Sequence, residues 1–338
     1  MNRPRKMLPI ALAMAALTAF AAPAGAQQKS DISITRQPGI LYLPSHVMEK
    51  QHLIEKEAEK LGVANLKVTW ANLSGGGAQT DALLSGNVDI VNTGVGNLLL
   101  LWDRTKGGVK GIVANSALPL ALITRNPGIR TLQDYGPNDR IAVPTLKVST
   151  QAILLQMAAE KAFGPDQTTK LDANAVQLGH PDAAIAMANP QGELTSHFAA
   201  PPFSYYELKN VKGAHIVLSS PDVIGGPLTQ SQFFTTTKFA DANPKVIAAI
   251  KAATFSAIDF IRKDTRAAVE IYREITQDKT SVDDIMEMLK QPGMMEWNAA
   301  PQGTMKFAAH LHKVGTLKTM PKAWTEYYLP TTADLPGD

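Results

Sequence analysis

Two segments, one with a serine and three glycines and one with a pair of hydroxyl residues, have the residue types that bind a small anion. The first is Ser74 with Gly75, Gly76 and Gly77, directly before an amphipathic run of helical spacing that ends at Gly86. Serine is a favoured N-cap, and glycines let the N–H groups of a helix start come close to a guest. Because a helix N-terminus has unpaired donors and partial positive charge, this segment predicts one side of an anion site. Taken alone, the same residues fit a flexible loop before a helix equally well.

The second segment repeats this arrangement further along the chain. A predicted strand leads through a loop to Ser149 and Thr150, and a helix is predicted from there to about Phe163. Between the two segments, another predicted strand ends in a polar turn that contains Thr93 and Gly94. Two helix N-termini in two tandem units indicate a ligand cleft between the units.

His197 is the histidine with the most interesting position, at the end of a predicted strand in the segment 195–203. A histidine there can donate a hydrogen bond to a ligand or carry charge against a carboxylate. A core histidine whose hydrogen bonds are satisfied within the protein is an equally good interpretation. Arg36 precedes Gln37, so strand alternation places it on the other face from the site. We expect Arg36 to form a surface or interdomain ion pair.

The motifs of common secreted enzymes are absent from the sequence. It contains no Gly-x-Ser-x-Gly elbow, no Ser-x-x-Lys, no His-Glu-x-x-His and no phosphate-binding Gly-Lys-Ser/Thr loop. The absence of cysteine excludes zinc–thiolate sites, disulfides and a cysteine nucleophile. His310 and His312 lie on nearly opposite sides of a predicted helix, a poor arrangement for chelation. We therefore expect no catalytic residue, no metal and no cofactor.

The first 26 residues have the composition of a cleavable export signal. Arg3, Arg5 and Lys6 precede an apolar run over 8–22, and small residues follow at 24–26. A permanent membrane anchor is the alternative, but the apolar run is short for a span. Removing the three basic residues lowers the formal net charge from +3 to 3 − 3 = 0, so nucleic acid is not an expected partner. Without cysteine there is no lipid-modified residue at the junction, and we expect a free protein of a Gram-negative periplasm.

The order of predicted elements is that of two α/β units with a helical C-terminus. A chain of 338 residues, 45% hydrophobic and 19% charged, is long enough for two domains. Strands and helices alternate as in mostly parallel sheets flanked by helices, and helices predominate from Pro244. We predict one lobe over 31–117 plus 229–338, and a second lobe over 118–228. In such sheets ligands bind beyond the carboxyl ends of the strands.

These features resemble the periplasmic substrate-binding proteins of ABC importers, in the branch that serves nitrate, sulfonates, taurine and thiamine precursors. The matching pieces are ITRQPGILYLP, SGGGAQTDALLSGNVDIVNTG, ALITRNPGIRTLQDYGPNDRIAVP with the hydroxyl pair after it, and HPDAAIAMANPQGELTSHFAAPPF, within 31–235. The resemblance implies a type II-like fold, with two lobes joined by two crossovers that close over one ligand. The chain departs from the family at Ser196-His197-Phe198, where an acidic or tryptophan-bearing sequence is common. A histidine there favours an anion such as a carboxylate, or a polar ring.

By this resemblance the protein binds a small anionic organic molecule without transforming it. It would act as a monomer in the periplasm and deliver the ligand to an ABC permease in the inner membrane. Two alternatives share the fold: a periplasmic ligand sensor, and an enzyme similar to the pyrimidine-precursor synthases that would use a histidine. The residues expected to contact the ligand are Gln37, Leu41, Ser74, Gly75, Gly76, Thr93, Gly94, Asn115, Ser149, Thr150, His197, Phe198 and Pro201.

Overall fold

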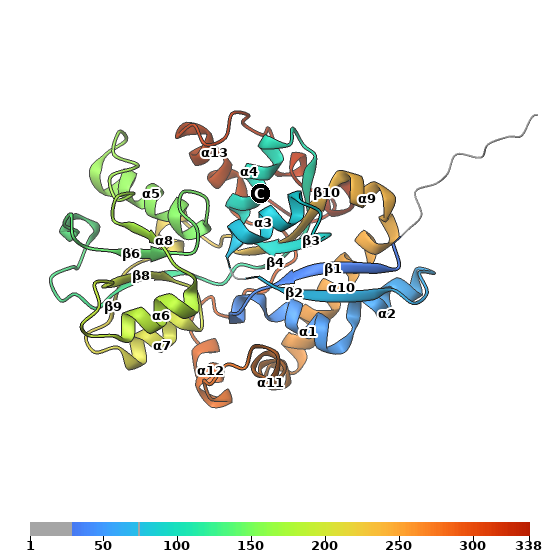
Figure 1. The fold of residues 1–338 in the computed structure, drawn as a ribbon, viewed down its shortest axis with the longest axis horizontal. Helices are drawn as coiled ribbons and strands as arrows, with labels where there is room; N and C mark the ends of the chain where they lie inside the picture. Colours follow the sequence, from blue (N-terminus) through green and yellow to red (C-terminus); the bar gives the residue numbers. More distant parts are fainter. Residues whose placement is uncertain (1–28, 74) are drawn as a thin grey trace, which may run out of the picture.

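The computed structural model describes residues 29–73 and 75–338, which form two lobes, each built on a five-stranded sheet (Figure 1). The first lobe, on the right in Figure 1, contains the strands β1 (Asp31–Arg36), β2 (Lys67–Asn72), β3 (Ile90–Thr93), β4 (Val109–Ser116) and β10 (Ser231–Thr236). The second lobe contains β5 (Ala121–Thr124), β6 (Ile141–Val143), β7 (Ala175–Gln177), β8 (Ser196–Ala199) and β9 (His215–Ser219). The strand orders are β2-β1-β3-β10-β4 and β7-β6-β8-β5-β9.

Helices flank both sheets. Those between the strands of the first lobe are α1 (Leu43–Gln51), α2 (Leu53–Lys60), α3 (Gly76–Leu84) and α4 (Val95–Arg104). The second lobe has α5 (Thr150–Phe163), α6 (His180–Ala188), α7 (Phe203–Asn210) and α8 (Ser220–Ile224). The C-terminal part has α9 (Thr237–Ala242), α10 (Pro244–Lys263), α11 (Thr265–Thr276), α12 (Val282–Leu289) and α13 (Thr304–Lys313).

Both sheets are mixed, with four strands in one direction and one strand against them. In the first lobe β10 is antiparallel to β3 and β4, and in the second lobe β5 is antiparallel to β8 and β9. The other pairings, β1 with β2 and β3, and β6 with β7 and β8, are parallel. β5 and β10 are the first strands after the chain passes between the sheets, so each passage adds one reversed strand. The prediction of two mostly parallel sheets flanked by helices, with a helical C-terminus, is confirmed.

The two passages between the lobes run side by side, over 117–120 and 225–230. The Leu120 N–H donates to Ser220 Oγ at 2.9 Å, and the Ser220 N–H donates to the Leu120 carbonyl at 2.8 Å. At the other end, the Gln230 N–H donates to the Ser116 carbonyl at 2.8 Å. Because these short segments carry the chain between the sheets, they are where a change of angle between the lobes would be absorbed.

The structure differs from the prediction at several elements, among them the short helices α8 and α9. The sequence analysis misses β10, since Phe233 and Phe234 are adjacent and both fully buried, so this inner strand lacks alternation. It also misses the short helix α7. The sequence over 41–61 predicts a single helix, whereas the structure has two, because His52, with φ 51 and ψ 44, adopts the left-handed conformation that ends α1.

The C-terminal part covers the first lobe and reaches the second. Helix α10 packs against α1, α2 and β4, while α13 contacts α4 of the first lobe and α5 of the second. The Gly111 N–H donates to the Tyr327 carbonyl at 2.8 Å, and the Leu329 N–H donates to the Gly111 carbonyl at 2.7 Å. Trp324, Tyr327 and Tyr328 thus hold the tail on the first lobe. None of the helices within 29–73 and 75–338 is long and apolar enough to cross a bilayer.

Candidate functional site

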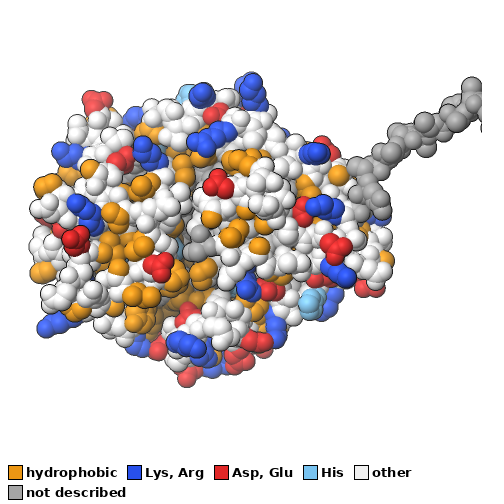
Figure 2. All heavy atoms as spheres, in the orientation of Figure 1, with side chains coloured by type: hydrophobic (Ala, Val, Ile, Leu, Met, Phe, Trp, Pro, Cys, Tyr) orange, Lys and Arg blue, Asp and Glu red, His pale blue; other side chains and the backbone are white. Residues whose placement is uncertain are grey.

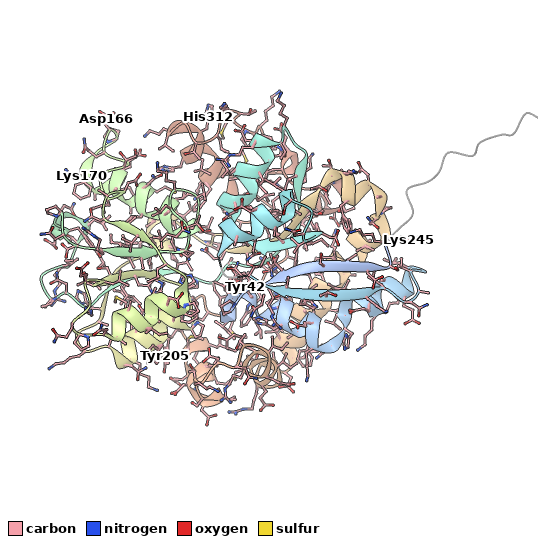
Figure 3. All side chains as sticks on the ribbon, viewed as in Figure 1. Tyr42, Asp166, Lys170, Tyr205, Lys245 and His312 are labelled. Carbon is pink, nitrogen blue, oxygen red and sulfur yellow. The ribbon has the colours of Figure 1, made fainter. Side chains whose placement is uncertain are left out.

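A small cavity lies between the two lobes. Its volume is about 40 Å³, room for roughly three water molecules or a compact ion. Figure 3 shows Tyr42, one of its wall residues, at the junction of the lobes. The wall residues are Gln37, Leu41, Tyr42, Gly76, Thr93, Gly94, Asn97, Leu120, Pro144, Ser149, Thr150, Gln151, His180 and Gln230.

Four helices begin at the cavity wall, two from each lobe. Gly76 is the first residue of α3, and Gly94 is the N-cap of α4. Ser149 is the N-cap of α5, and His180 is the first residue of α6. Each N-terminus brings unpaired backbone N–H groups and about half a positive charge. None of the described wall residues is a lysine, arginine, aspartate or glutamate, so these helix ends dominate the electrostatics of the cavity.

The lobes touch each other around the cavity. The Ile40 N–H of the first lobe donates to the Pro201 carbonyl of the second at 3.3 Å. A Cβ atom added at Gly94 would lie 2.7 Å from Thr150 Oγ1, closer than a real Cβ contact allows. A glycine at this position therefore lets the N-termini of α4 and α5 approach closely, and the lobes stand in a closed arrangement.

On the first-lobe side, Gln37 organises the polar wall. Its Nε2 donates to the Tyr42 hydroxyl at 2.7 Å and to the Asn92 carbonyl at 3.1 Å, while its Oε1 accepts from the Gly75 N–H at 3.0 Å. Burial raises the pKa of Tyr42 above its ordinary value, so the phenol keeps its proton. Since the Tyr42 oxygen accepts from Gln37, its own O–H remains a donor that the cavity can use.

Gln230 supplies a second donor from the crossover that returns to the first lobe. Its side chain is 4% exposed, and its Nε2 has no hydrogen-bond partner among residues 29–73 and 75–338. A buried donor left without a partner costs about 1–3 kcal/mol. Because Gln230 is also a wall residue, a ligand that accepts from this amide would recover that free energy.

On the second-lobe side, a series of hydrogen bonds runs from the wall into the core; we call its members, Gln151, His180, His197 and Glu207, the histidine chain. Gln151 Nε2 lies 3.1 Å from His180 Nε2, His180 Nδ1 lies 2.8 Å from His197 Nε2, and His197 Nδ1 lies 2.6 Å from Glu207 Oε1. The side chains of His197 and Glu207 are fully buried. The His180 ring also stacks on Phe203, with ring centroids 5.7 Å apart.

Burial shifts the pKa values of the histidine chain toward the neutral forms. It raises the pKa of Glu207 to about 8 and lowers the pKa of His197 to about 3. The pKa of His180 is held well below its ordinary value, first by burial and then by the neighbouring His197. At pH 7 the three groups are therefore uncharged, although His197 and Glu207 are within ion-pair distance.

Comparison with solved structures identifies the fold. The alkanesulfonate-binding protein SsuA from Xanthomonas axonopodis pv. citri, bound to MOPS, is similar over 87% of this chain and 96% of its own, with a TM-score of 0.68 and 15% identity. The fold is that of the periplasmic binding proteins. The nitrate-binding protein NrtA from Synechocystis PCC 6803 matches 87% of this chain and 84% of its own, with a TM-score of 0.69 and 13% identity.

A third solved structure agrees with this binding-protein fold. The periplasmic aliphatic sulphonate-binding protein SsuA from Escherichia coli is similar over 92% of this chain and 95% of its own, with a TM-score of 0.66 and 17% identity. No protein-family model and no curated protein sequence matches the chain. At these identities the likeness concerns the fold, and the ligand has to be argued from the cavity itself.

The structure brings several of the predicted contact residues together at the wall. They are Gln37, Leu41, Gly76, Thr93, Gly94, Ser149 and Thr150. Gly75 lies beside them as the N-cap of α3. Ser74 lies outside the described residues. Gly76 and Ser149, one from each of the two predicted helix starts, thus line the same cavity.

Four predicted contact residues lie outside the cavity wall. Asn115 is fully buried and donates from Nδ2 to Asn92 Oδ1 at 3.0 Å. His197 and Phe198 are fully buried in β8, so His197 acts on the cavity only through His180. The Pro201 carbonyl is used by the contact between the lobes. His180, the first residue of α6, lies between His197 and the cavity.

Arg36 pairs with Glu49 of α1 within the first lobe. Its Nη1 lies 2.7 Å from Glu49 Oε1 and 2.9 Å from Oε2, and both side chains are partly exposed. The predicted ion pair is thus observed. Among the described residues, no group of three or more histidine, aspartate or glutamate side chains is placed to hold a metal ion.

The sequence analysis misses the other wall residues, and two of them carried a usable signal. Pro181 sits in the first turn of α6, which places His180 at a helix start. Gln151 directly follows the predicted N-cap pair. Tyr42, Asn97 and the crossover residues gave no such signal, because only the packing of the lobes brings them to the wall.

A larger groove lies outside the interlobe cavity. It has a volume of about 630 Å³ and runs between α6, α7 and the segment 278–284. Apolar side chains gather over this part of the surface at the lower left of Figure 2. The groove is open and mostly apolar, whereas the helix N-termini and the unpaired amide face the small cavity. We therefore place the site in the cavity.

Proposed function

We propose that this protein is the solute-binding component of an ABC importer and captures a small anion between its two lobes. The observation that carries the proposal is the cavity between the lobes at which α3, α4, α5 and α6 all begin, in a fold shared with periplasmic binding proteins. Such a site offers an anion many N–H donors and repels a cation. Since the donors come from both lobes, a bound anion favours the closed arrangement.

The arrangement is strong enough for useful affinity without an ionic partner. A helix N-terminus contributes about 0.3–1 kcal/mol to an exposed anion and up to about 2 kcal/mol in a partly buried geometry. Hydrogen bonds to a charged group contribute about 1.5–3 kcal/mol each. Four helix ends with two or three such bonds reach the roughly 8 kcal/mol of a micromolar complex.

The size of the cavity restricts the ligand to a compact anion. A space of about 40 Å³ takes a head group of a few atoms, such as nitrate, formate, acetate or methanesulfonate. Leu41, Leu120 and Pro144 give the wall an apolar part that suits a methyl group. Phe198 and Pro201 do not reach the wall and would not shelter a longer tail.

We also propose the biological setting that this function requires. Residues 1–26 act as a cleavable export signal, and the mature chain is a periplasmic monomer without a lipid anchor that docks on an ABC permease of the inner membrane. The first lobe comprises 31–117 plus 229–338, and the second lobe comprises 118–228. The short crossovers and the similarity to periplasmic binding proteins support this division.

A thermal-shift screen on the purified protein tests the function. Nitrate, formate, acetate and methanesulfonate are the probes, with acetamide and methylammonium as neutral and cationic controls. At a hundred times its Kd, a ligand adds about 2.7 kcal/mol to the free energy of unfolding, which raises Tm by a few degrees. We expect such a rise for at least one anion. No rise for any anion, or an equal rise with acetamide, would refute the proposal.

A substitution at Gln230 separates binding from stability. Gln230→Leu removes a buried amide whose Nε2 has no partner among the described residues, so the unliganded protein should be as stable as the wild type or more so. The affinity for the anion found in the screen should fall about tenfold, because one hydrogen bond to a charged group is lost. Calorimetry gives the affinity and urea unfolding gives the stability. Unchanged affinity would remove Gln230 from the site.

A further inference from the structure

The histidine chain can hold its hydrogen bonds in only two directions. A neutral imidazole has one N–H, so each ring donates on one side and accepts on the other. If Glu207 is ionised, it accepts from His197 Nδ1, His197 Nε2 accepts from His180 Nδ1, and His180 Nε2 accepts from the Gln151 amide N–H. If Glu207 is protonated, every bond reverses. The two directions differ by one proton.

The direction of the chain decides what Gln151 presents to the cavity. In the ionised direction one of the two N–H groups of the Gln151 amide is used by the bond to His180. In the protonated direction His180 Nε2 carries a hydrogen, so the Gln151 amide turns its oxygen to the ring and frees its NH₂ group. Because Gln151 is a wall residue, the protonated direction gives the cavity one more N–H donor than the ionised direction does.

The surroundings of Glu207 favour the protonated direction. Helix α7 packs on α6 and β5, and α6 packs on β8. Strand β5 has no charged residue, and β8 has only His197. The other charged or titratable groups on these helices and across the groove are Asp182, Tyr205, Tyr206, Lys209, Asp278, Lys279 and Asp284. Among the described residues, none of these groups forms a hydrogen bond with the histidine chain. Lys209 pairs with Asp284 at the surface.

A buried carboxylate without a cation costs several kcal/mol, so the neutral acid is the stable form near neutral pH. Glu207 Oε2 has no hydrogen-bond partner among residues 29–73 and 75–338. That suits the carbonyl oxygen of a neutral acid better than a charged carboxylate oxygen. Burial accordingly raises the pKa of Glu207 to about 8.

We propose that Glu207, acting through His197 and His180, couples anion binding to one proton: the cavity binds an anion when Glu207 is protonated and loses affinity when that proton leaves. The inference rests on the proposed function and adds its regulation. Glu207 and His197 are positioning residues, since only His180 and Gln151 reach the wall. One proton from solvent is taken up at His180 Nε2, the proton on His180 Nδ1 passes to His197 Nε2, and the proton on His197 Nδ1 passes to the Glu207 carboxylate. The chain thus gains one proton in total, and its hydrogen bonds reverse.

The coupling predicts how far the affinity for the anion changes with pH. If only the protonated form binds, the apparent Kd rises in proportion to the fraction of protein that has lost the proton. With a Glu207 pKa of about 8, affinity is level below pH 7 and falls about tenfold by pH 9 and about a hundredfold by pH 10. Above pH 9, binding takes up close to one proton per anion.

The first arm of the test needs no ligand. Nitrogen-15 NMR of the wild-type protein from pH 6 to 10 reports which ring nitrogen of each histidine carries the hydrogen. We expect His180 and His197 to switch together from Nε2–H to Nδ1–H with a single midpoint near pH 8. The switch should vanish in Glu207→Gln, whose neutral amide cannot titrate. Rings that keep one tautomer throughout this range would overturn the inference.

The second arm measures binding of nitrate, which does not titrate in this range, and of any other anion that succeeds in the thermal screen. Calorimetry at pH 6 to 10 should show the stated loss of affinity in the wild type and a level profile in Glu207→Gln. Glu193→Gln removes an exposed carboxylate of the same lobe and should keep the wild-type profile. A tautomer switch with level anion binding overturns only the coupling. A switch with no anion bound overturns the proposed function, and the coupling with it.

Discussion

Replacing Gly96 by alanine should block closure of the lobes while leaving the unliganded fold intact. Gly96 lies in the first turn of α4, and a Cβ atom there would be 2.2 Å from the Val148 carbonyl oxygen and 2.4 Å from Ile153 Cδ1. Val148 and Ile153 belong to the second lobe. Alanine favours a helix over glycine by up to about 1 kcal/mol, so α4 itself is not weakened.

The geometry gives the size of the effect. Ordinary contact begins at 3.4 Å, so the carbonyl must retreat by about 3.4 − 2.2 = 1.2 Å, and a backbone group cannot rotate away as a flexible side chain would. Overpacking of this kind costs about 1–3 kcal/mol. If that cost applies to the closed form alone, ligand affinity falls roughly fivefold to a hundred-and-fiftyfold.

Gly77 provides the matched control. It lies in the first turn of α3 and also faces the second lobe, but its added Cβ would meet Thr145 Cγ2 at 3.5 Å, an ordinary contact. Calorimetry with the anion from the screen should show weaker binding for Gly96→Ala and affinity within about twofold of wild type for Gly77→Ala. Both variants should keep the unliganded Tm. Equal affinity of the two variants would show that closure at Gly96 is no part of the bound state.

Two further predictions concern the second-lobe N-terminus and a buried histidine. Changing both Ser149 and Thr150 to alanine should weaken anion binding, measured by calorimetry, at least about tenfold. It should also lower Tm, because Ser149 Oγ accepts from the Ala152 N–H as the N-cap of α5. Unchanged affinity would remove the pair from the site. Burial lowers the pKa of His46 to about 3. The contribution of neutral His46 to the free energy of unfolding is therefore complete above pH 6.5 and is lost as pH falls toward 3, with a loss of about 3 kcal/mol at pH 4. Urea unfolding from pH 4 to 7 should show a smaller loss in His46→Gln, and equal losses would contradict this assignment.

Much of the fold could be read along the chain because its signals are local. Helix starts were marked by the hydroxyl pair at Ser149 and Thr150 and by the glycines around Gly76. Strand and helix alternation gave two α/β units. The prediction failed where the local signal was weak, as at Phe233 and Phe234 in β10, because a strand buried on both faces has no period to detect.

The sequence by itself determined the two lobes and the donor-rich helix starts, because capping residues and hydrophobic periodicity act over a few neighbours. Only the tertiary structure decided which side chains share the cavity. His197 was expected at the ligand, yet packing of α6 over β8 buries it and sends His180 to the wall instead. Glu207, ten residues after His197, becomes its hydrogen-bond partner because α7 packs against α6. Burial then sets its pKa, and burial is a property of the packed lobe that no short stretch of sequence contains.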